Sequence, residues 1–521
     1  MSKTDSAGHT LATALDSTPA STWTPAYRES WRQDLRASIV VFLVALPLCL
    51  GIALASGAPL MAGVVTGIIG GIVVGVASGS HLMVSGPAAG LTAIVLSAIT
   101  TLGGFPAFLT AVFLAGLMQM ALGLLRAGVI GYYFPNSVIR GMLAGIGLII
   151  ILRQLPYALG ADAVSAADGI AAAFAAAHTG TVIISLVALG ILLLWDQKFM
   201  KPFAVVPGAL IAVLVCTALN ALFGPELVVQ GAQLVNLPLI QSVGALDEAL
   251  ESPLWSALAN SAVWVAALTI AIVASLETLL SLEATDRMDP LKREAPANRE
   301  LFAQGIGNAL CGLLGGLPMT GVIVRSSANV YAGAKTKASA IIHGVLLVVA
   351  VFTIPTLLNL IPLAVLAIVL IHTGFKLAHP RQLKNFLRQG FHQWLPFVVT
   401  IVAILVQDLL IGIAIGLAFS LFFILLEHLS APCFETETTE ANITHLRLNK
   451  HLTFLHKASI TAALQAFKPG SQVIIDGSKC RHVDHDVLDV LRDFQSSARE
   501  RRLDVTITGL DLNASSIGMG H

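Results

Sequence analysis

Charged and aromatic residues are scarce in this chain. Only 12% of its 521 residues are Asp, Glu, Lys or Arg and 6% are aromatic, whereas soluble domains carry about 25% charged residues. Thirty basic and thirty acidic side chains cancel, so no overall field favours nucleic acid or an acidic partner. The composition excludes an ordinary soluble protein, and we expect no nucleic-acid binding.

Cysteine is scarce as well. The chain has five cysteines, far apart and without CxxC spacing: Cys49, Cys216, Cys311, Cys433 and Cys480. This spacing argues against a zinc ribbon, a redox motif and a disulfide framework. We therefore expect no metal and no cofactor.

Apolar sequence is abundant, because 56% of the residues are hydrophobic. Fourteen apolar segments can be marked, near 37–55, 61–79, 88–100, 106–124, 139–159, 180–195, 204–223, 260–282, 298–315, 320–331, 338–357, 362–375, 393–408 and 411–429. Most are long enough to cross the hydrocarbon core of a bilayer. The pattern predicts an all-α polytopic membrane domain over 37–430. Residues 1–36 lack the apolar region of a signal peptide, and we interpret them as a cytosolic tail.

The distribution of basic residues sets the orientation, because cytoplasmic loops collect Lys and Arg. With the N terminus inside, the loops expected outside, at 161–178 and 224–259, contain no Lys or Arg. The loops expected inside contain Arg126, Arg140, Lys198, Lys201, Arg287, Lys292, Arg293, Arg299, Lys335, Lys337, Lys376, Arg381, Lys384 and Arg388. We therefore expect an inner-membrane protein in contact with lipid, with both termini in the cytosol.

The third and tenth segments are too short for full spans and begin at Gly/Pro-containing sequences. Short, interrupted segments at corresponding positions of two halves are typical of transporters built from inverted repeats, here seven plus seven spans. The N terminus of a helix carries unpaired N–H groups and a partial positive charge, which favours an anion. We expect the half-helix starts at Ala88 and Val322 to lie in contact around one anion. An ordinary turn is the alternative for Ser-Gly-Pro alone.

Two charged residues fall inside these apolar segments near the expected site. Arg325 follows the second half-helix start, and a lone charge there is costly unless it is paired or hydrated. Glu277 lies in the eighth segment with Ser281 on the same helix face. Arg325 is either an anchor for the anion or a partner for Glu277 or a backbone carbonyl. Glu277 is either a proton-coupling group, since burial favours its neutral form, or a static partner for Arg325.

After Glu427 the sequence has the pattern of a soluble domain. It predicts strands at 443–448, 452–456, 472–476 and 503–508 and helices at 458–467 and 485–499. We therefore expect a small cytosolic α/β domain over 431–521. Its cluster of His482, Asp484, His485 and Asp486 lacks the spacing of a metal site.

Four motifs closely resemble the SulP anion transporters, called solute carrier family 26 in animals. They are Leu46-Pro47-Leu48 through Ser56-Gly57, Val84-Ser85-Gly86-Pro87-Ala88-Ala89-Gly90, Ser275 through Ser281, and Gly315-Gly316-Leu317-Pro318 through Arg325 to Val330. The C-terminal segment resembles the STAS domain that this family carries. The resemblance implies a core domain that moves against a gate domain, and a homodimer.

The resemblance also implies roles for single residues. It places substrate binding at Leu48, Ile52, Ala88, Ala89, Gly321, Val322, Ile323 and Arg325, and ion coupling at Glu277 and Ser281. The family's sodium-coupled bicarbonate transporters have Asp-x-x-x-Thr where this chain has Glu277 and Ser281, so a proton is favoured over sodium. Ser478 is a candidate regulatory site, because related soluble domains are phosphorylated in this turn; a solvated turn is the alternative.

We thus expect a secondary active transporter of a small inorganic anion, and not an enzyme, since no nucleophile, base and orienting group converge. The few hydroxyl groups at the expected site favour a small, singly charged anion. The resemblance to bacterial members favours bicarbonate. Sulfate or dicarboxylate transport, anion exchange and a channel-like uniporter are the alternatives.

Overall fold

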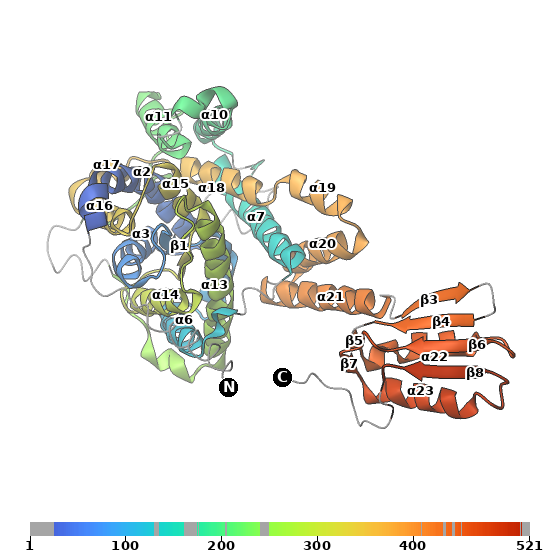
Figure 1. Cartoon of the computed structure of the whole chain (residues 1–521). Helices are drawn as coiled ribbons and strands as arrows, with labels where there is room; N and C mark the ends of the chain where they lie inside the picture. The colour runs from blue at the N-terminus through green and yellow to red at the C-terminus, as the bar shows by residue number, and fades with distance from the viewer. Residues whose placement is uncertain are drawn as a thin grey trace. The chain divides into compact units, whose positions relative to one another are not determined.

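The computed structural model describes residues 25–129, 135–160, 174–175, 177–203, 206–239, 250–407, 409–430, 434–439, 443–449, 451–510 and 512. The described chain divides into two compact units, residues 1–417 and 418–521. Both are shown in Figure 1, where each can be followed by its colour and labels. The first unit is helical apart from two short strands, and the second contains the main sheet.

The first unit contains the apolar helices. In its first half they are α2 (Pro25–Ala55), α3 (Leu60–Ile69), η1 (Gly70–Val74), α4 (Gly75–Ala77), η2 (Ala89–Leu91), α5 (Thr92–Thr101), α6 (Phe105–Leu124), α7 (Asn136–Leu159), α10 (Thr179–Trp195), η4 (Lys198–Phe203) and α11 (Gly208–Leu222). In its second half they are η5 (Gly231–Gln233), η6 (Trp255–Ala259), α13 (Ser261–Met288), α14 (Ala297–Leu313), α15 (Ile323–Tyr331), α16 (Ala338–Thr353), α17 (Pro355–Leu358), α18 (Leu363–Leu377), α19 (Pro380–Arg388), α20 (Phe391–Val406) and α21 (Leu409–Ser430), which continues past the boundary between the units.

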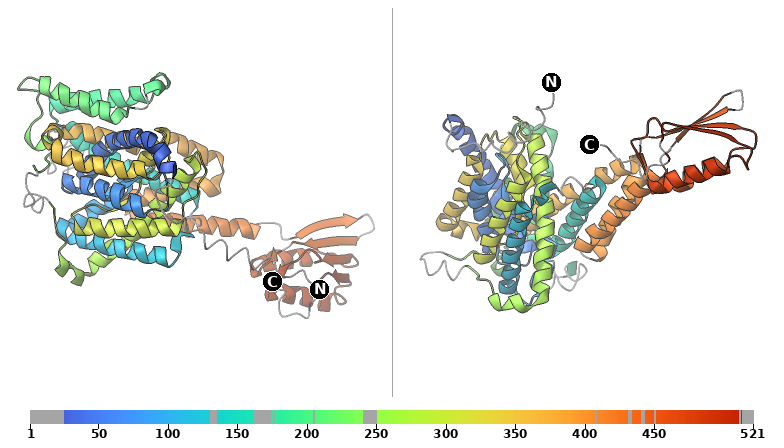
Figure 2. Two further views of the ribbon diagram at one scale, coloured as in Figure 1. Left: turned by 60° about the vertical axis from the view of Figure 1, so that its left-hand side comes forward. Right: turned by 60° about the horizontal axis from the view of Figure 1, so that its bottom comes forward.

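Each of the fourteen expected segments contains one of these helices, so the prediction of an all-α polytopic membrane domain is confirmed. Six described helices are long and apolar enough to cross a membrane, and six more apolar helices have 10–17 residues. Both views in Figure 2 show the long helices of this unit running side by side. Helix α2 begins at Pro25, inside the segment that we interpret as a tail.

Two short strands interrupt the helical unit. They are β1 (Ser85–Pro87) and β2 (Met319–Gly321), and both are fully buried. From the sequence we expect half-helices to start at these residues, whereas in the structure they form strands that lead into the helices. Their backbone groups cannot be hydrated in the interior, so the two segments satisfy each other's hydrogen bonds.

The second unit is a small α/β domain, as predicted. Its strands are β3 (Phe434–Thr439), β4 (Ile443–Leu448), β5 (His451–Leu452), β6 (Gln472–Asp476), β7 (His482–Val483) and β8 (Asp504–Thr508), and its helices are η7 (Phe454–His456), α22 (Lys457–Gln465) and α23 (His485–Ser497). The main sheet has the order β3-β4-β6-β8, with β3 antiparallel and the other three strands parallel. Burial alternates along β4 and β6, and their inward residues pack against α22 and α23 in one core.

Candidate anion-binding site

The candidate site is built on the antiparallel pair of β1 and β2. Ser85 lies opposite Gly321, Gly86 opposite Thr320 and Pro87 opposite Met319. Each strand continues directly into a helix: Ala88 is the N-cap residue of η2, which leads into α5, and Val322 is the N-cap residue of α15. Segments more than 200 residues apart in the sequence therefore meet at the centre of the first unit, where Figure 1 shows β1 among α3, α13 and α15.

The two helix starts are not in contact, so that expectation is wrong. In the observed register Ala88 is level with Pro318, and Val322 is level with Val84, whose carbonyl accepts the Val322 N–H at 2.9 Å. The starts therefore lie four residues apart along the strand pair, roughly 13 Å at the rise of a β-strand. The reason is the antiparallel pairing. The C-terminal ends of β1 and β2 lie at opposite ends of the strand pair, so the two helices begin at opposite ends of it.

The backbone at both ends suits an anion. The first N–H groups of each helix have no acceptor within the helix and carry its positive dipole end. Ala88 and Gly321 are buried and offer no side-chain hydrogen-bonding group. An anion at either start would therefore be bound mainly by backbone N–H groups.

Arg325 is the largest of the fully buried side chains, and none of its surface is exposed. Its Nη2 donates a weak hydrogen bond to Cys49 Sγ at 3.4 Å, while Nε and Nη1 have no partner within the described residues. The guanidinium packs against Gly86 of β1, where an added Cβ would lie 2.9 Å from Cζ. A buried cation with unused donors is costly, and it provides positive potential directly behind the strand pair.

Glu277 lies on α13 at the other end of β1. Its carboxylate abuts Gly90 of η2, where an added Cβ would lie 2.7 Å from Oε2 and 2.8 Å from Oε1. Oε2 is buried and has no hydrogen-bond partner within the described residues. The structure therefore places an intramembrane carboxylate at the start of the first half-helix.

The structure does not pair these two charges. No acidic oxygen of a described residue lies within 4.0 Å of the Arg325 guanidinium, so no ion pair joins it to Glu277. Arg325 packs at Gly86 and Glu277 at Gly90, one on each side of the same short segment. The alternative of a static ion pair between Glu277 and Arg325 is therefore not observed in the described part of the chain.

Helix α13 also contacts the second strand. The Gly321 N–H donates to Thr278 Oγ1 at 3.3 Å, so neighbouring residues of α13 reach both half-helix segments. Ser281 lies one turn further along and is buried. In the described part of the chain its hydroxyl makes no hydrogen bond to β1 or β2, and its carbonyl accepts from the Thr285 hydroxyl at 2.6 Å.

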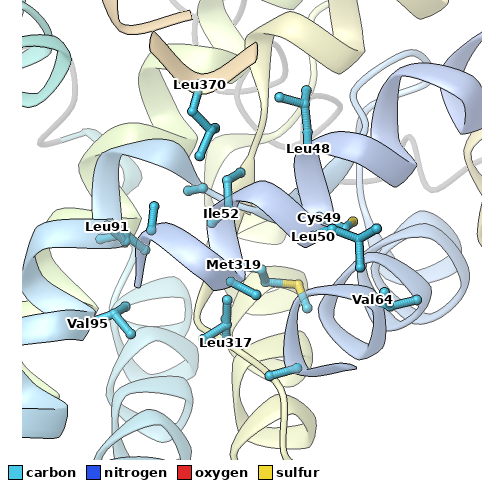
Figure 3. Packing of buried hydrophobic residues seen from close by; sticks show 14 of the residues in the cluster. Leu48, Cys49, Leu50, Ile52, Val64, Leu91, Val95, Leu317, Met319 and Leu370 are labelled. Carbon is cyan, nitrogen blue, oxygen red and sulfur yellow. The ribbon is translucent and has the colours of Figure 1, made fainter. Parts of the chain in front are cut away.

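The expected apolar residues gather in one cluster. Leu48, Ile52 and Ala88 are buried in the same core, and Ala89 packs against it. Figure 3 shows Leu48 and Ile52 of α2 among the surrounding side chains of this packing, which include Leu91 and Met319. Ile323 differs from them, because 40% of its surface is exposed.

Sequence reasoning missed several residues that build the site. Gly86 and Gly90 leave room for the two charges, and Thr278 fixes β2. Gln304 of α14 donates to Ser85 Oγ at 2.6 Å and to Glu300 at 3.0 Å, which connects β1 to a fully buried carboxylate. Their signal in the sequence is a glycine or a polar residue in or beside an apolar segment, and this signal does not show which element each residue contacts.

Ser478 lies in the second unit, in the turn after β6. Its hydroxyl and N–H both donate to Asp476 Oδ1, at 2.6 and 2.9 Å. These hydrogen bonds hold the pKa of Asp476 below its ordinary value. The turn is exposed, so Ser478 is accessible for modification, although its hydroxyl is already engaged.

Comparison with known proteins agrees with this architecture. The sequence model of the sulfate permease family matches residues 31–427. The chain is 30% identical over 344 residues to the putative sulfate transporter YvdB of Bacillus subtilis, covering 64% of this chain and 62% of that protein. It is 28% identical over 347 residues to the bicarbonate transporter BicA of Synechocystis, covering 64% and 58%. The match thus spans about three fifths of the length of these relatives.

Solved structures have the same fold. The transmembrane domain of a cyanobacterial bicarbonate transporter BicA superposes with a TM-score of 0.62 at 25% identity, over 74% of this chain and 97% of that one. A structure of SLC26A9 superposes with a TM-score of 0.75 at 16% identity, over 96% of this chain and 87% of that one. The second similarity concerns the fold alone.

Proposed function

Because the chain belongs to the sulfate permease family, we propose that it is a secondary active transporter of a small inorganic anion, namely bicarbonate. The anion lies at the β1–β2 pair between the two half-helix N termini, where backbone N–H groups of one start bind it and the positive ends of both helices attract it. Movement of a core domain that carries this pair against a gate domain exposes the site to each side of the membrane in turn. The protein lies in the inner membrane with both termini in the cytosol.

One observation carries the proposal. Arg325 is fully buried, and two of its guanidinium nitrogens have no partner within the described residues. A cation in this position lowers the free energy of an anion at the neighbouring strand pair, because Coulomb attraction is strong where water is excluded.

Bicarbonate is favoured by the chemistry of the side chains around the helix starts. Ala88, Ala89, Val322 and Ile323 offer no hydroxyl or charged group. A small monovalent anion needs fewer compensating charges than sulfate does, and one cation with two helix dipoles supplies them. The similarity to BicA supports the same substrate, whereas the similarity to YvdB supports sulfate as the second candidate.

Glu277 is the proposed coupling group, with a proton as the coupling ion. Its carboxylate lies at the start of the first half-helix without a cationic partner. A proton on Glu277 removes a negative charge that would repel the anion, so proton and anion bind together. Ser281, whose hydroxyl lies one turn further along α13, is the second residue of the proposed coupling site.

Transport by purified protein in liposomes tests the function. We expect uptake of labelled bicarbonate that increases with an inward proton gradient and does not respond to sodium. Sulfate, chloride and succinate serve as competitors, and protein-free liposomes correct for passage of carbon dioxide. Uptake of sulfate that bicarbonate does not inhibit would instead identify sulfate, the second candidate, as the substrate.

A homodimer is the proposed assembly, with the C-terminal domain contributing to its formation or to trafficking. Substrate binding requires no residue of that domain. Deletion from Cys433 onward should therefore retain a folded membrane unit and weaken the dimer, as measured by light scattering in detergent. An unchanged dimer would locate the contact elsewhere.

Phosphorylation at Ser478 is the proposed regulation, and Ser478→Ala should abolish any phosphate incorporation there.

A further inference from the structure

Helix α19 connects two apolar helices at one end of the first unit. It runs from Pro380 to Arg388 between α18 and α20. The ring of His379 caps it by accepting the Arg381 N–H at 3.1 Å, and Pro380 occupies its first turn. Because α18 and α20 are successive spans, α19 lies at a membrane surface, beside α20 in Figure 1.

One face of α19 is basic. Arg381, Lys384 and Arg388 follow at i, i+3 and i+7, so they lie on the same side of the helix. All three are exposed, and none forms an ion pair with a described residue. The sequence contains no Asp or Glu between Glu300 and Asp408, so no acidic residue of this stretch is available to neutralise them.

The opposite face of α19 is apolar and only partly covered. Phe386 is buried and stacks on Phe397 of α20, with ring centroids 4.8 Å apart. Leu383 and Leu387 are 39% and 52% exposed. A helix with a charged face and a partly uncovered apolar face lies in the membrane interface, with its apolar side in contact with acyl chains.

We propose that the basic face of α19 binds the headgroups of anionic phospholipids in the cytoplasmic leaflet. Charge complementarity identifies the ligand, because basic clusters beside a membrane-spanning helix attract anionic lipid at about 1 kcal/mol per residue. Lipid binding anchors α19, and through Phe386 and Phe397 it anchors α20, to the membrane surface. The inference rests on the inside orientation proposed above, and it does not depend on which anion is transported.

Native mass spectrometry of the purified full-length protein in detergent tests this inference. The probes are dioleoyl-phosphatidylglycerol and, as the zwitterionic reference, dioleoyl-phosphatidylcholine. The variant combines Arg381→Gln, Lys384→Gln and Arg388→Gln. Phosphatidylglycerol should bind about fivefold more weakly for each charge removed, while phosphatidylcholine binding stays unchanged.

A matched control removes three exposed cations from the second unit by Lys468→Gln, Lys479→Gln and Arg499→Gln, and it should bind both lipids as the unaltered protein does. A second variant, Arg381→Lys with Arg388→Lys, retains the charge and should retain binding. Should the triple variant fail to fold, Lys384→Gln alone should still show the fivefold loss.

Equal phosphatidylglycerol binding by the triple variant and the unaltered protein would overturn the inference. So would release of the bound lipid by millimolar inorganic phosphate, since the site would then be specific for a soluble anion. The measurement needs no ion gradient. Lipid binding can therefore be measured even if the protein does not transport bicarbonate, and the two proposals are tested separately.

Discussion

The two half-helix segments have the same backbone plan and different charges around them. Each consists of a three-residue buried strand followed by a helix, and the strands pair with each other. Beside the first segment lie a carboxylate, Glu277 at Gly90, and a guanidinium, Arg325 at Gly86. The second segment supplies that guanidinium and is held by a neutral hydroxyl, Thr278. Backbone symmetry thus provides two helix ends of the same polarity, while the asymmetric side chains place a carboxylate, the proposed coupling group, at only one of them.

Glu277→Gln is expected to have the largest effect on this asymmetry. Glutamine resembles the neutral carboxylic acid and cannot release a proton, so anion binding should persist while proton-driven accumulation is lost. Uptake by liposomes with and without an inward proton gradient measures both properties. If the variant accumulates the anion to the native level, Glu277 is not the coupling group.

Gly86→Ala should disturb the side of the segment that faces Arg325. The added methyl group would lie 2.9 Å from Arg325 Cζ, which cannot move freely because the side chain is fully buried. We expect a loss of about 1–3 kcal/mol in stability together with weaker anion affinity, measured as a lower melting temperature and a higher KM. Gly190→Ala on α10 is the control, since nothing lies within 4 Å of its added Cβ, and it should leave KM unchanged without lowering the melting temperature, because alanine favours a helix more than glycine does.

Gly90→Ala should disturb the opposite side, and its effect should depend on Glu277. The added methyl group would lie 2.7 Å from Oε2 of that carboxylate. A double-mutant cycle with Glu277→Ala measures the dependence, because the shortened side chain leaves room for the methyl group. We expect a coupling energy within about 0.5–3 kcal/mol. Additive effects on the melting temperature would show that Gly90 and Glu277 do not act on each other.

Thr278→Val is expected to have the smallest effect. It preserves the shape of the side chain and removes the acceptor for the Gly321 N–H, at a cost of about 1–3 kcal/mol if the N–H is left without a partner. The long distance of 3.3 Å favours the lower end of this range. Substrate affinity should fall while proton dependence stays, in contrast to Glu277→Gln. A loss of proton dependence would assign a coupling role to the second segment as well.

Much of the architecture follows from the sequence by itself. The apolar runs predicted the apolar helices of the first unit, because a bilayer leaves long apolar helices as almost the only solution, whereas the polar helix α19 between two of these runs was not predicted. The strands at 443–448 and 472–476 were predicted to the residue, since alternating burial in a soluble sheet gives a period of two. Glu277 and Arg325 were identified because a charge inside an apolar run is conspicuous.

The tertiary structure decided how these parts meet. No local pattern distinguishes Ser85–Pro87 and Met319–Gly321 from ordinary turns, because each is a strand only through its pairing with a segment more than 200 residues away. That pairing set the separation of the two helix starts and overturned the expected contact between Ala88 and Val322. The absence of an ion pair between Glu277 and Arg325 likewise depends on which glycine each charge packs against. Hydropathy and charge are properties of local sequence and can therefore be predicted from it. Strand register and close packing depend on contacts between residues that are distant in the sequence.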